Sequence, residues 1–432
     1  MNCSRAMVAR GGDYERRKFS GERTRLACKG QSGPDFRRRT ETIFCCGPIS
    51  HYAWDLQRKV RDGEDAIAST RDACATRIRR MPAVAENYSL GLPVEIGKID
   101  KELKKLWAES AGAMTRASLI NLAVYSEAPG SLEKNTRLIA KIAENHACRA
   151  IVIGADCKAK ENRVAAWVSA HCHISRAGSK QICSEQLSFR LEGPCAKLLP
   201  SIVFSHLDSD LPFYLWWQGE LHDPMDPQLW AWVDRFIYDS HDWRDFGAQM
   251  HLVETAQREA RQRIVLCDLN WTRLDWVRYA VAQFFDHPAS HHHFSEIENV
   301  QIDFASGFRS TAVLLAGWLG AQLNWTVENE QRGNNFKFID PAGRKIDIEL
   351  HEQDDSPIGK IVLNSGGIEF VVAAARCGDL LEIWRGGQNE KPVPQMMPAQ
   401  SNDPVSLMNQ ELMRAAPHRV YLRAVSCVRE LF

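Results

Sequence analysis

Four charged residues near the middle of the chain have the types and spacing best suited to chemistry. Asp239 ends a predicted helix, and Asp268 leads from a predicted strand into a helix that carries Arg273 and Arg278. Carboxylates can exchange protons with a substrate, and guanidinium groups bind phosphates through paired hydrogen bonds. These residues could therefore bind a phosphosugar or act as acid and base. They could also be helix caps and ion pairs, which we favour because an Asp before a helix N-terminus is stabilising in itself.

Histidines offer a second set of candidate ligands. His171 and His173 lie on one face of a predicted strand and could share a metal ion with Cys183 or Glu185 from the neighbouring strand. We favour instead two half-exposed histidines in a sheet. The run His291–His293 can also chelate metal, but consecutive side chains point in different directions, so we favour a solvated loop. We expect neither a metal nor a cofactor.

The 13 cysteines do not follow a metal-binding or secretory pattern. CxxC and CxxCH spacings are absent and no secretory hydrophobic region precedes the cysteines, so a zinc ribbon and a secreted disulfide framework are both disfavoured. We predict a cytoplasmic protein in a reducing compartment. Cys172 and Cys183 lie on neighbouring predicted strands and could form a regulatory pair, although we favour buried, reduced thiols.

Familiar enzyme signatures are also absent. The sequence contains no GxGxxG, GxxxxGK[ST], GxSxG or HExxH motif. These motifs mark dinucleotide-binding loops, P-loops, hydrolase nucleophile elbows and zinc proteases. Their absence weakens an enzymatic interpretation without excluding it.

Composition describes an ordinary soluble chain of several domains. The 432 residues are 44% hydrophobic and 25% charged, which is typical of globular proteins. The longest apolar stretch, Ala312–Leu323, is shorter than the roughly 20 residues that span a bilayer. Residues 81–432 carry 36 basic and 44 acidic side chains, which argues against a phosphate-binding surface. We therefore expect no nucleic-acid or membrane partner.

The first part of the chain differs from the rest. Residues 1–80 carry 18 basic and 10 acidic side chains, five cysteines and no sustained hydrophobic periodicity. We predict that residues 1–85 are a disordered or non-native basic extension and that Met81 is the natural start. A transit peptide is the competing interpretation, but such peptides are poor in acidic residues.

Alternating strands and helices follow. The pattern predicts a strand over 119–125, a helix over 132–143 and a strand over 150–153, whose right-handed crossover makes the strands parallel. Strands over 164–174 and 181–191 form a hairpin across a turn at Gly178. The fold class is α/β, and we assign residues 86–294 to an α/β sandwich-type domain with a mixed sheet.

The central segment is rich in tryptophan and completes this domain. Seven of the 13 Trp residues lie between Trp216 and Trp276. We predict a strand over 213–217 and a helix from Pro227 to Ile237 that Asp226 caps. A strand over 264–266 and a helix capped by Thr272, with two apolar faces, come next.

A polar break over 287–293 marks the predicted domain boundary. Beyond it we expect a strand over 300–304, a helix over 311–323 and an antiparallel meander with turns at 340–343 and 364–367. A helical region over 405–432 is interrupted at Pro417. These elements predict a smaller α+β domain over 295–432.

Five segments in this order carry a family resemblance. They are Arg116–Val124, His146–Arg149, Leu211–Gly219, Asp234–Ser240 and Asp268–Leu274. Together they resemble the glucose-6-phosphate dehydrogenase assembly protein family, OpcA, over a region from about Leu92 to the C-terminus. Two departures concern local geometry: Ala147 replaces the usual Pro, and Val277 separates Trp276 from Arg278.

This resemblance implies a non-catalytic protein that binds glucose-6-phosphate dehydrogenase and promotes its active oligomer in the oxidative pentose phosphate pathway. Tryptophan, tyrosine and arginine are enriched in protein interfaces. The implied partner-binding residues are Trp216, Trp217, Asp239, Asp268, Trp271, Arg273 and Arg278. The alternative is a sugar-phosphate-binding enzyme or metabolite sensor that uses Asp239, Asp268 and Arg273.

Overall fold

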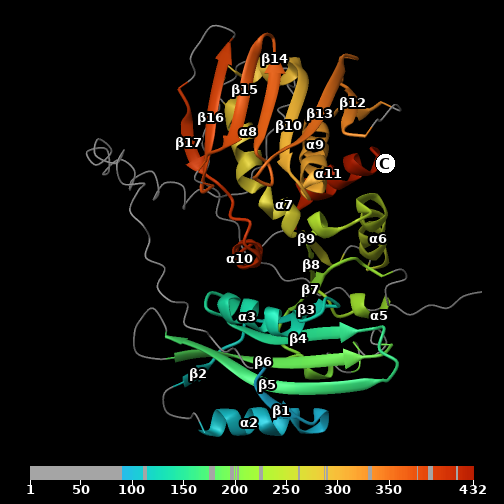
Figure 1. Cartoon of the computed structure of the whole chain (residues 1–432), viewed down its shortest axis with the longest axis vertical. Coiled ribbons are helices and arrows are strands. Elements are labelled where there is room, and N and C mark those ends of the chain that lie inside the picture. The colour runs from blue at the N-terminus through green and yellow to red at the C-terminus, as the bar shows by residue number, and fades with distance from the viewer. Residues whose placement is uncertain are drawn as a thin grey trace, which may run out of the picture. The chain divides into compact units, whose positions relative to one another are not determined.

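Two mixed β-sheets organise the described part of the chain in a computed structural model (Figure 1). It describes residues 90–432 except 110–113, 175–180, 195–198, 200, 202–203, 223–226, 261–262, 287, 289, 329–332, 377, 388–392 and 415–416. The predicted basic extension with Met81, the turn at Gly178 and the cap at Asp226 lie outside the described residues. The mixed sheets and their helices confirm the predicted α/β fold class.

The first sheet has nine strands within the described residues. They are β1 (Leu92–Val94), β2 (Met114–Arg116), β3 (Ile120–Ser126), β4 (Cys148–Asp156), β5 (Arg163–Ile174), β6 (Gln181–Glu192), β7 (Phe213–Gln218), β8 (Arg235–Tyr238) and β9 (Val265–Asp268). The run β6-β4-β3-β7-β8-β9 is parallel throughout, while β5 and β1 extend it in antiparallel fashion and β2 pairs with β6. Within this parallel run, β3 comes first in the sequence and lies in the middle, with β4 and β6 on one side and β7, β8 and β9 on the other. Doubly wound dinucleotide-binding domains have the same strand order.

The second sheet runs β11-β12-β13-β10-β14-β15-β16-β17. Its strands are β10 (Ile297–Ala305), β11 (Thr326–Val327), β12 (Asn335–Ile339), β13 (Lys345–Asp354), β14 (Lys360–Ser365), β15 (Ile368–Ala374), β16 (Leu380–Gly387) and β17 (Gln395–Pro398). Strands β14 to β17 form the predicted antiparallel meander. Gly343, Gly366 and Gly367 adopt positive φ at the two predicted turns.

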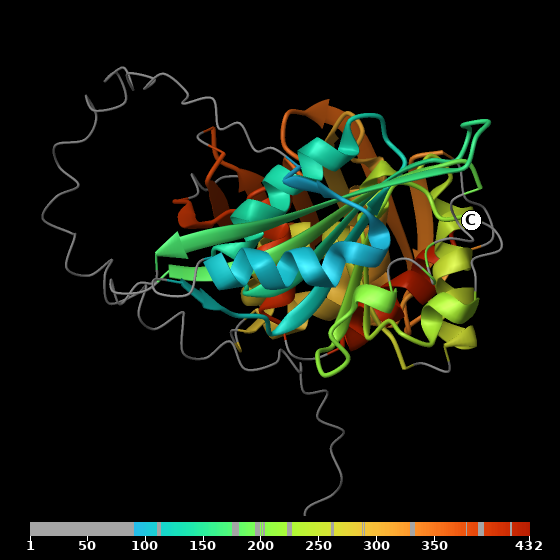
Figure 2. The ribbon, with the colours of Figure 1, turned by 90° about the horizontal axis from the view of Figure 1, so that it is seen from below.

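Helices cover both sheets. They are α2 (Ile99–Glu109), α3 (Ser131–Ala143), α5 (Pro227–Trp230), α6 (Phe246–Glu259), α7 (Leu269–Arg273), α8 (Asp275–Asp286), α9 (Arg309–Leu323), α10 (Pro404–Leu412) and α11 (Arg419–Arg429). Four short 3-10 helices are described: η2 (Ile96–Lys98), η4 (Phe204–His206), η5 (Ser240–Asp242) and η6 (His291–Glu296). Helix α2 crosses the strands of the first sheet in Figure 2, whereas α8 and α9 pack on the second sheet. Within the described residues, no helix combines the length and apolar composition needed to cross a bilayer.

Several predicted elements are confirmed. Strands β3 and β4 are parallel and joined by α3, and β5 and β6 form an antiparallel pair. Helices α10 and α11 lie on either side of Pro417. Trp216 and Trp217 of β7 point to opposite faces of the sheet and join two different hydrophobic clusters, as the alternation of side chains along a strand requires.

The helix predicted from Pro227 to Ile237 is wrong beyond Trp230. Residues 235–238 are instead strand β8, and all four are buried between β7 and β9. A short apolar run fits either a buried helix or a central parallel strand, so its periodicity cannot decide between them. These residues form a strand because β7 and β9 lie on either side of them and pair with them.

The helix predicted to start at Thr272 is also wrong in its first turn. Asp268 caps α7 by accepting a hydrogen bond from the backbone N–H of Asn270, and Thr272 lies inside that helix. A break at Leu274 then separates α7 from α8. The polar break likewise contains a 3-10 helix, η6, where we favoured a solvated loop.

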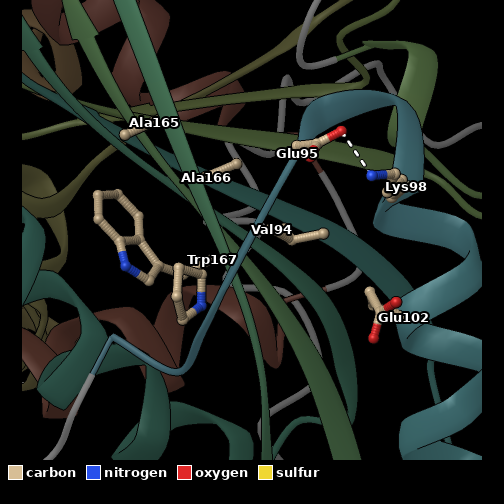
Figure 3. A pocket seen from close by; sticks show the side chains of 8 residues that line it. Val94, Glu95, Lys98, Glu102, Ala165, Ala166 and Trp167 are labelled. Atoms are coloured by element: carbon tan, nitrogen blue, oxygen red, sulfur yellow. Dashed lines mark ion pairs between the residues drawn. The ribbon is translucent and has the colours of Figure 1, made fainter.

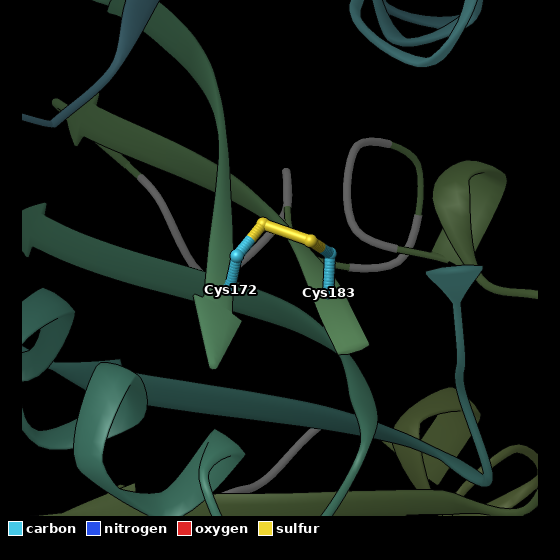
Figure 4. Close-up of a disulfide and its surroundings, with 2 residues drawn as sticks. All are labelled: Cys172 and Cys183. Carbon is cyan, nitrogen blue, oxygen red and sulfur yellow. A yellow bond between two sulfur atoms is a disulfide. The ribbon is translucent and has the colours of Figure 1, made fainter. Parts of the chain in front are cut away.

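The Cys172–Cys183 pair overturns the favoured assignment of reduced, buried thiols. The two residues lie directly opposite each other on β5 and β6 and form a disulfide (Figure 4). Their Cα atoms are 4.1 Å apart because antiparallel pairing places opposed side chains side by side. Cys183 is buried, whereas Cys172 is exposed.

Candidate functional site

The ends of β8 and β9 bring the predicted charged residues together. Tyr238 and Asp268 are register partners on these parallel strands, so Asp239 and Asp268 emerge at the same edge of the first sheet. Asp268 caps α7, and this short helix carries Arg273 one turn later. A sheet edge and a helix N-terminus thus assemble the cluster.

Asp239 and Arg273 form a bidentate ion pair. The Arg273 Nη1 and Nη2 atoms donate to the two Asp239 carboxylate oxygens at 3.1 and 2.8 Å. Two further hydrogen bonds of the guanidinium group run from Nε to Asn402 Oδ1 at 2.6 Å and from Nη1 to Asn270 Oδ1 at 3.0 Å. Only 3% of the Arg273 side chain is exposed, so the group is committed to protein partners.

Asp268 is completely buried among hydrogen-bond donors. It accepts bonds from the Ser240 backbone N–H at 3.0 Å, from Ser240 Oγ at 2.7 Å and from Tyr421 Oη at 3.2 Å. Burial and the nearby Asp239 carboxylate raise the pKa of Asp268 to about 7, although the bonds from Ser240 and Asn270 favour its charged form. A carboxyl group in this setting can hold a proton near neutral pH.

His241 completes the charged part of the cluster. Its ring nitrogens lie 2.8 Å from an Asp239 oxygen and 3.0 Å from an Asp242 oxygen. Burial opposes its protonation, but the hydrogen bonds to these two carboxylates outweigh burial and raise the pKa of His241 to about 9. Burial likewise opposes ionisation of Asp239, yet the bonds from His241 and Arg273 lower the pKa of Asp239 to about 2.

Residues from distant parts of the chain close the network. The hydroxyl groups of Tyr238 and Tyr421 lie 2.7 Å apart, and Thr311 Oγ1 of α9 donates to Asn270 Oδ1 at 2.6 Å. No motif in the sequence marked Tyr421, Thr311 or Asn402 as site residues. The local signal was Asn270, which lies inside the motif segment Asp268–Leu274, whereas His241 directly follows the segment Asp234–Ser240.

Trp271 and Arg278 form the outer part of the cluster. Trp271 is 1% exposed, and the Arg278 guanidinium carbon lies 3.4 Å from the centroid of its ring. Arg278 also pairs with Asp275, which in turn contacts Arg414 after α10. This stack holds the start of α8 against α7 and α10.

Trp216 and Trp217 lie apart from this cluster. Trp217 is at the carboxyl ends of β3 and β7, where doubly wound sheets bind ligands. Its ring centroid is 4.1 Å from that of Tyr125, whose hydroxyl donates to Glu127 Oε1 at 2.6 Å. His222 Nε2 lies 2.5 Å from the same oxygen. Tyr125 and Trp217 belong to the buried hydrophobic core, and the segment that follows β3 lacks the Gly-rich motif that holds a pyrophosphate.

The histidines of β5 do not assemble with their proposed metal ligands. His171 Nε2 lies 2.8 Å from Gln186 Oε1, and Cys183 is bonded to Cys172. Glu185 is 1% exposed and forms ion pairs with Arg116 at 2.8 Å and Arg149 at 3.0 Å. This pairing joins two of the motif segments, at the start of β4 and the end of β2.

An open pocket of about 410 Å³ lies elsewhere, between β1, the start of α2 and β5 (Figure 3). Trp167 lines one side, and Glu95, Lys98 and Glu102 line the other. Glu95 and Lys98 pair with each other at 2.8 Å. None of the predicted site residues lines this pocket.

Two family models match the chain in succession. Residues 139–255 match a model described as the glucose-6-phosphate dehydrogenase subunit N-terminal domain, and residues 264–425 match the corresponding C-terminal domain. Together these segments cover more than half of the 432 residues. They include the aspartates, arginines and tyrosines of the buried network.

Curated relatives agree with these models. A protein from Synechocystis sp. named as an OxPP cycle protein, OpcA, is 25% identical over 310 residues, which are 66% of this chain and 64% of the relative. A protein of the same name from Nostoc punctiforme is 25% identical over 262 residues, which are 58% of this chain and 56% of the relative. The match therefore spans somewhat less than two thirds of these relatives.

Among solved structures, an aldose-aldose oxidoreductase from Caulobacter crescentus aligns with a TM-score of 0.40 and 9% identity, over 72% of this chain and 94% of that protein. The two successive domain models and the OpcA relatives agree with each other in both name and position. The chain therefore belongs to the OpcA family.

Proposed function

We propose that this protein binds glucose-6-phosphate dehydrogenase and promotes its active oligomer in the oxidative pentose phosphate pathway without catalysing a reaction itself. The successive matches to the two domains of a glucose-6-phosphate dehydrogenase subunit carry this proposal. The names of the OpcA relatives, which refer to the OxPP cycle, support the same pathway.

The state of the charged cluster supports a non-catalytic role. Arg273 uses its guanidinium group on Asp239, Asn270 and Asn402, and Asp268 is fully buried. A phosphosugar would have to displace these bonds, which would leave several buried polar groups unpaired. The segment after β3 also lacks the Gly-rich loop that binds a dinucleotide in doubly wound domains.

We assign the partner contact to the exposed face of α8. Tyr279 is 46% exposed and stacks edge-on with the partly buried Trp276, at 6.2 Å between centroids. Large aromatic residues in such positions dominate protein interfaces. The buried residues Asp268, Trp271 and Arg273 belong to the segment that leads into α8. They fix the position of this helix and do not themselves touch the partner. Trp216 and Trp217 support the sheet.

The mechanism is a shift in population. A partner that binds the active oligomer of the dehydrogenase more tightly than its inactive form raises the fraction of active enzyme by that difference in affinity. Side chains on α8 need only recognise the assembled surface, and no group has to donate or accept a proton.

The test is a titration of the purified chain into the cognate dehydrogenase, with rate, Michaelis constant and oligomer size measured. The chain alone should show no turnover, and the mixture should show a higher rate or a lower Michaelis constant. Tyr279→Ala should weaken activation by about tenfold or more, since a hot-spot truncation costs at least about 1–2 kcal/mol. Trp232→Ala, at an aromatic residue in another region that is somewhat more exposed (56%), should leave activation unchanged.

The Arg273→Ala variant shows whether Arg273 positions α8 or contacts the dehydrogenase directly. Loss of one partner from a buried ion pair costs about 3–5 kcal/mol, so this variant should lose stability as well as activation. A stable Arg273→Ala protein that no longer activates would instead make the guanidinium a contact. Absence of any change in rate, affinity or oligomer size with the unmodified chain would refute the proposed function.

A further inference from the structure

We propose that His292, His293 and Glu296 form a binding site for a divalent transition-metal ion such as Zn²⁺. One ligand atom from each residue lies within 4.8 Å of the other two. All three belong to η6, whose three residues per turn bring His293 and Glu296 onto one side. Two imidazoles and one carboxylate are a donor set that suits Zn²⁺, Co²⁺ and Ni²⁺.

The backbone around His293 is fixed before any ion binds. Its N–H donates to the Ser290 carbonyl at 3.1 Å, and its own carbonyl accepts a bond from Ser365 Oγ at 2.8 Å. The ring packs on Phe370 with centroids 5.5 Å apart, and 13% of the side chain is exposed. His293 is therefore partly pre-organised as a metal ligand, which reduces the entropy lost when an ion binds.

The gap between the ligands matches an ion. His293 Nδ1 and a Glu296 oxygen are 3.9 Å apart, which exceeds a hydrogen bond. Bonds of about 2 Å from zinc to nitrogen and to oxygen place two such ligands roughly 3–4 Å apart. The His292 ring lies 3.9 Å from the His293 ring, centroid to centroid, and it is exposed, so it can turn toward the same point.

Gly366 keeps this space open from the side of the β14–β15 hairpin. A Cβ atom at residue 366 would lie 3.5 Å from Glu296 Oε2 and 3.8 Å from His293 Nδ1. The hairpin therefore presents backbone at residue 366, beside the Ser365 hydroxyl, whose Oγ lies 3.3 Å from His293 Nδ1 and would have to yield that atom to an ion. The adjacent guanidinium groups contact other atoms: Arg344 contacts the Ser295 carbonyl, and Arg385 donates to Ser290 Oγ at 3.3 Å.

A second group of potential ligands, Cys267, Glu411 and His418, is less suitable. Its atoms are also within 4.8 Å of one another, but two arginines already compensate Glu411. Arg235 lies 3.8 Å and Arg414 lies 3.7 Å from its carboxylate oxygens. A dication placed there would face two fixed positive charges in a buried setting.

Titration of the full chain with CoCl₂ and ZnCl₂, followed by calorimetry and visible absorption, tests the site. The unmodified protein should bind one ion with nitrogen and oxygen ligation, without the thiolate charge-transfer band that cysteine sites produce. Glu296→Gln removes the carboxylate at a side chain that is 47% exposed, so the fold should persist. This variant and His293→Ala should bind at least about tenfold more weakly, since even the loss of an outer-shell partner costs that much.

His291→Ala is the matched control, because His291 belongs to the same histidine run but lies outside the ligand group. It should retain the affinity of the unmodified protein and the rise in melting temperature that Zn²⁺ produces by mass action. Equal loss in His291→Ala and His293→Ala would reveal non-specific chelation by the run and overturn the site. Unchanged binding in Glu296→Gln would overturn it as well. Neither result depends on the dehydrogenase.

Discussion

At the scale of single residues, the charged motifs form a buried hydrogen-bond network and leave few groups free for chemistry. Asp239 balances Arg273 and His241, while Asp268 accepts bonds from Ser240 and Tyr421. Removing one member of such a network leaves its partners unpaired, which costs more than a surface pair contributes. The structural interpretation that we favoured for these aspartates and arginines therefore agrees with their hydrogen bonds and burial.

The contacts of His241 with Asp239 and Asp242 make the stability of the folded protein depend on pH. Its pKa is about 9 in the folded protein and 6.5 without these neighbours. The folded state therefore holds the proton more tightly, so the stabilisation is complete below about pH 6.5 and is lost as pH rises through 9. Urea unfolding of the protein and of His241→Asn should show a difference in unfolding free energy that shrinks between pH 7 and pH 9.5. A difference that stays constant over this range would contradict the assignment.

At the scale of elements, two glycines allow α9 to approach α11 closely. A Cβ atom at Gly317 would lie 2.3 Å from Val428 Cγ2 and 3.0 Å from the Ala424 carbonyl oxygen. One at Gly320 would lie 2.8 Å from Cys427 Sγ. The helices can therefore hold Tyr421 in reach of Asp268 only while these positions lack side chains.

Gly317→Ala should destabilise the protein even though alanine is the better helix former. Helix propensity favours alanine by about 1 kcal/mol, but overpacking a close contact costs about 1–3 kcal/mol, and the Ala424 carbonyl belongs to backbone that cannot turn away. Chemical denaturation measures the change in unfolding free energy, which is the sum of these two effects. Gly97→Ala is the control, because no atom lies within 4 Å of its added Cβ. A stabilised Gly317→Ala protein would show that α11 moves freely.

At the scale of the whole molecule, the two sheets share one hydrophobic cluster. It includes Phe236 and Trp271 from the first sheet and its connections, and Phe304, Phe370 and Tyr421 from the second sheet and α11. Buried hydrogen bonds from Tyr421 and Thr311 cross between them. Residues 86–294 and 295–432 remain our predicted domains, and this shared core couples their stabilities.

Unfolding of the described body should consequently be cooperative. Most Trp residues precede β10, among them Trp216 and Trp217 of β7 and Trp230 of α5, so tryptophan fluorescence reports chiefly on the first sheet and its connections. Far-ultraviolet circular dichroism reports on all elements. Coincident transitions by both probes are expected if the shared core melts as a unit. Two separated transitions would instead mean that the predicted domains fold independently.

Local patterns determined those features that depend on neighbouring residues. The parallel β3–α3–β4 unit, the β5–β6 hairpin and the Gly366–Gly367 turn follow from hydrophobic periodicity and from the conformations that glycine permits. The motif segments were likewise sufficient to identify the family, because several of them occur in order along one chain.

Tertiary structure decided what depends on distant partners. Arg235–Tyr238 became a strand because β7 and β9 flank it, and Asp268 acquired its proton affinity from burial and from Asp239. Its bond to Tyr421 joins residues 153 positions apart. Periodicity records which face of an element is apolar, but it carries no information on which element covers that face, and burial and hydrogen bonding both depend on that choice.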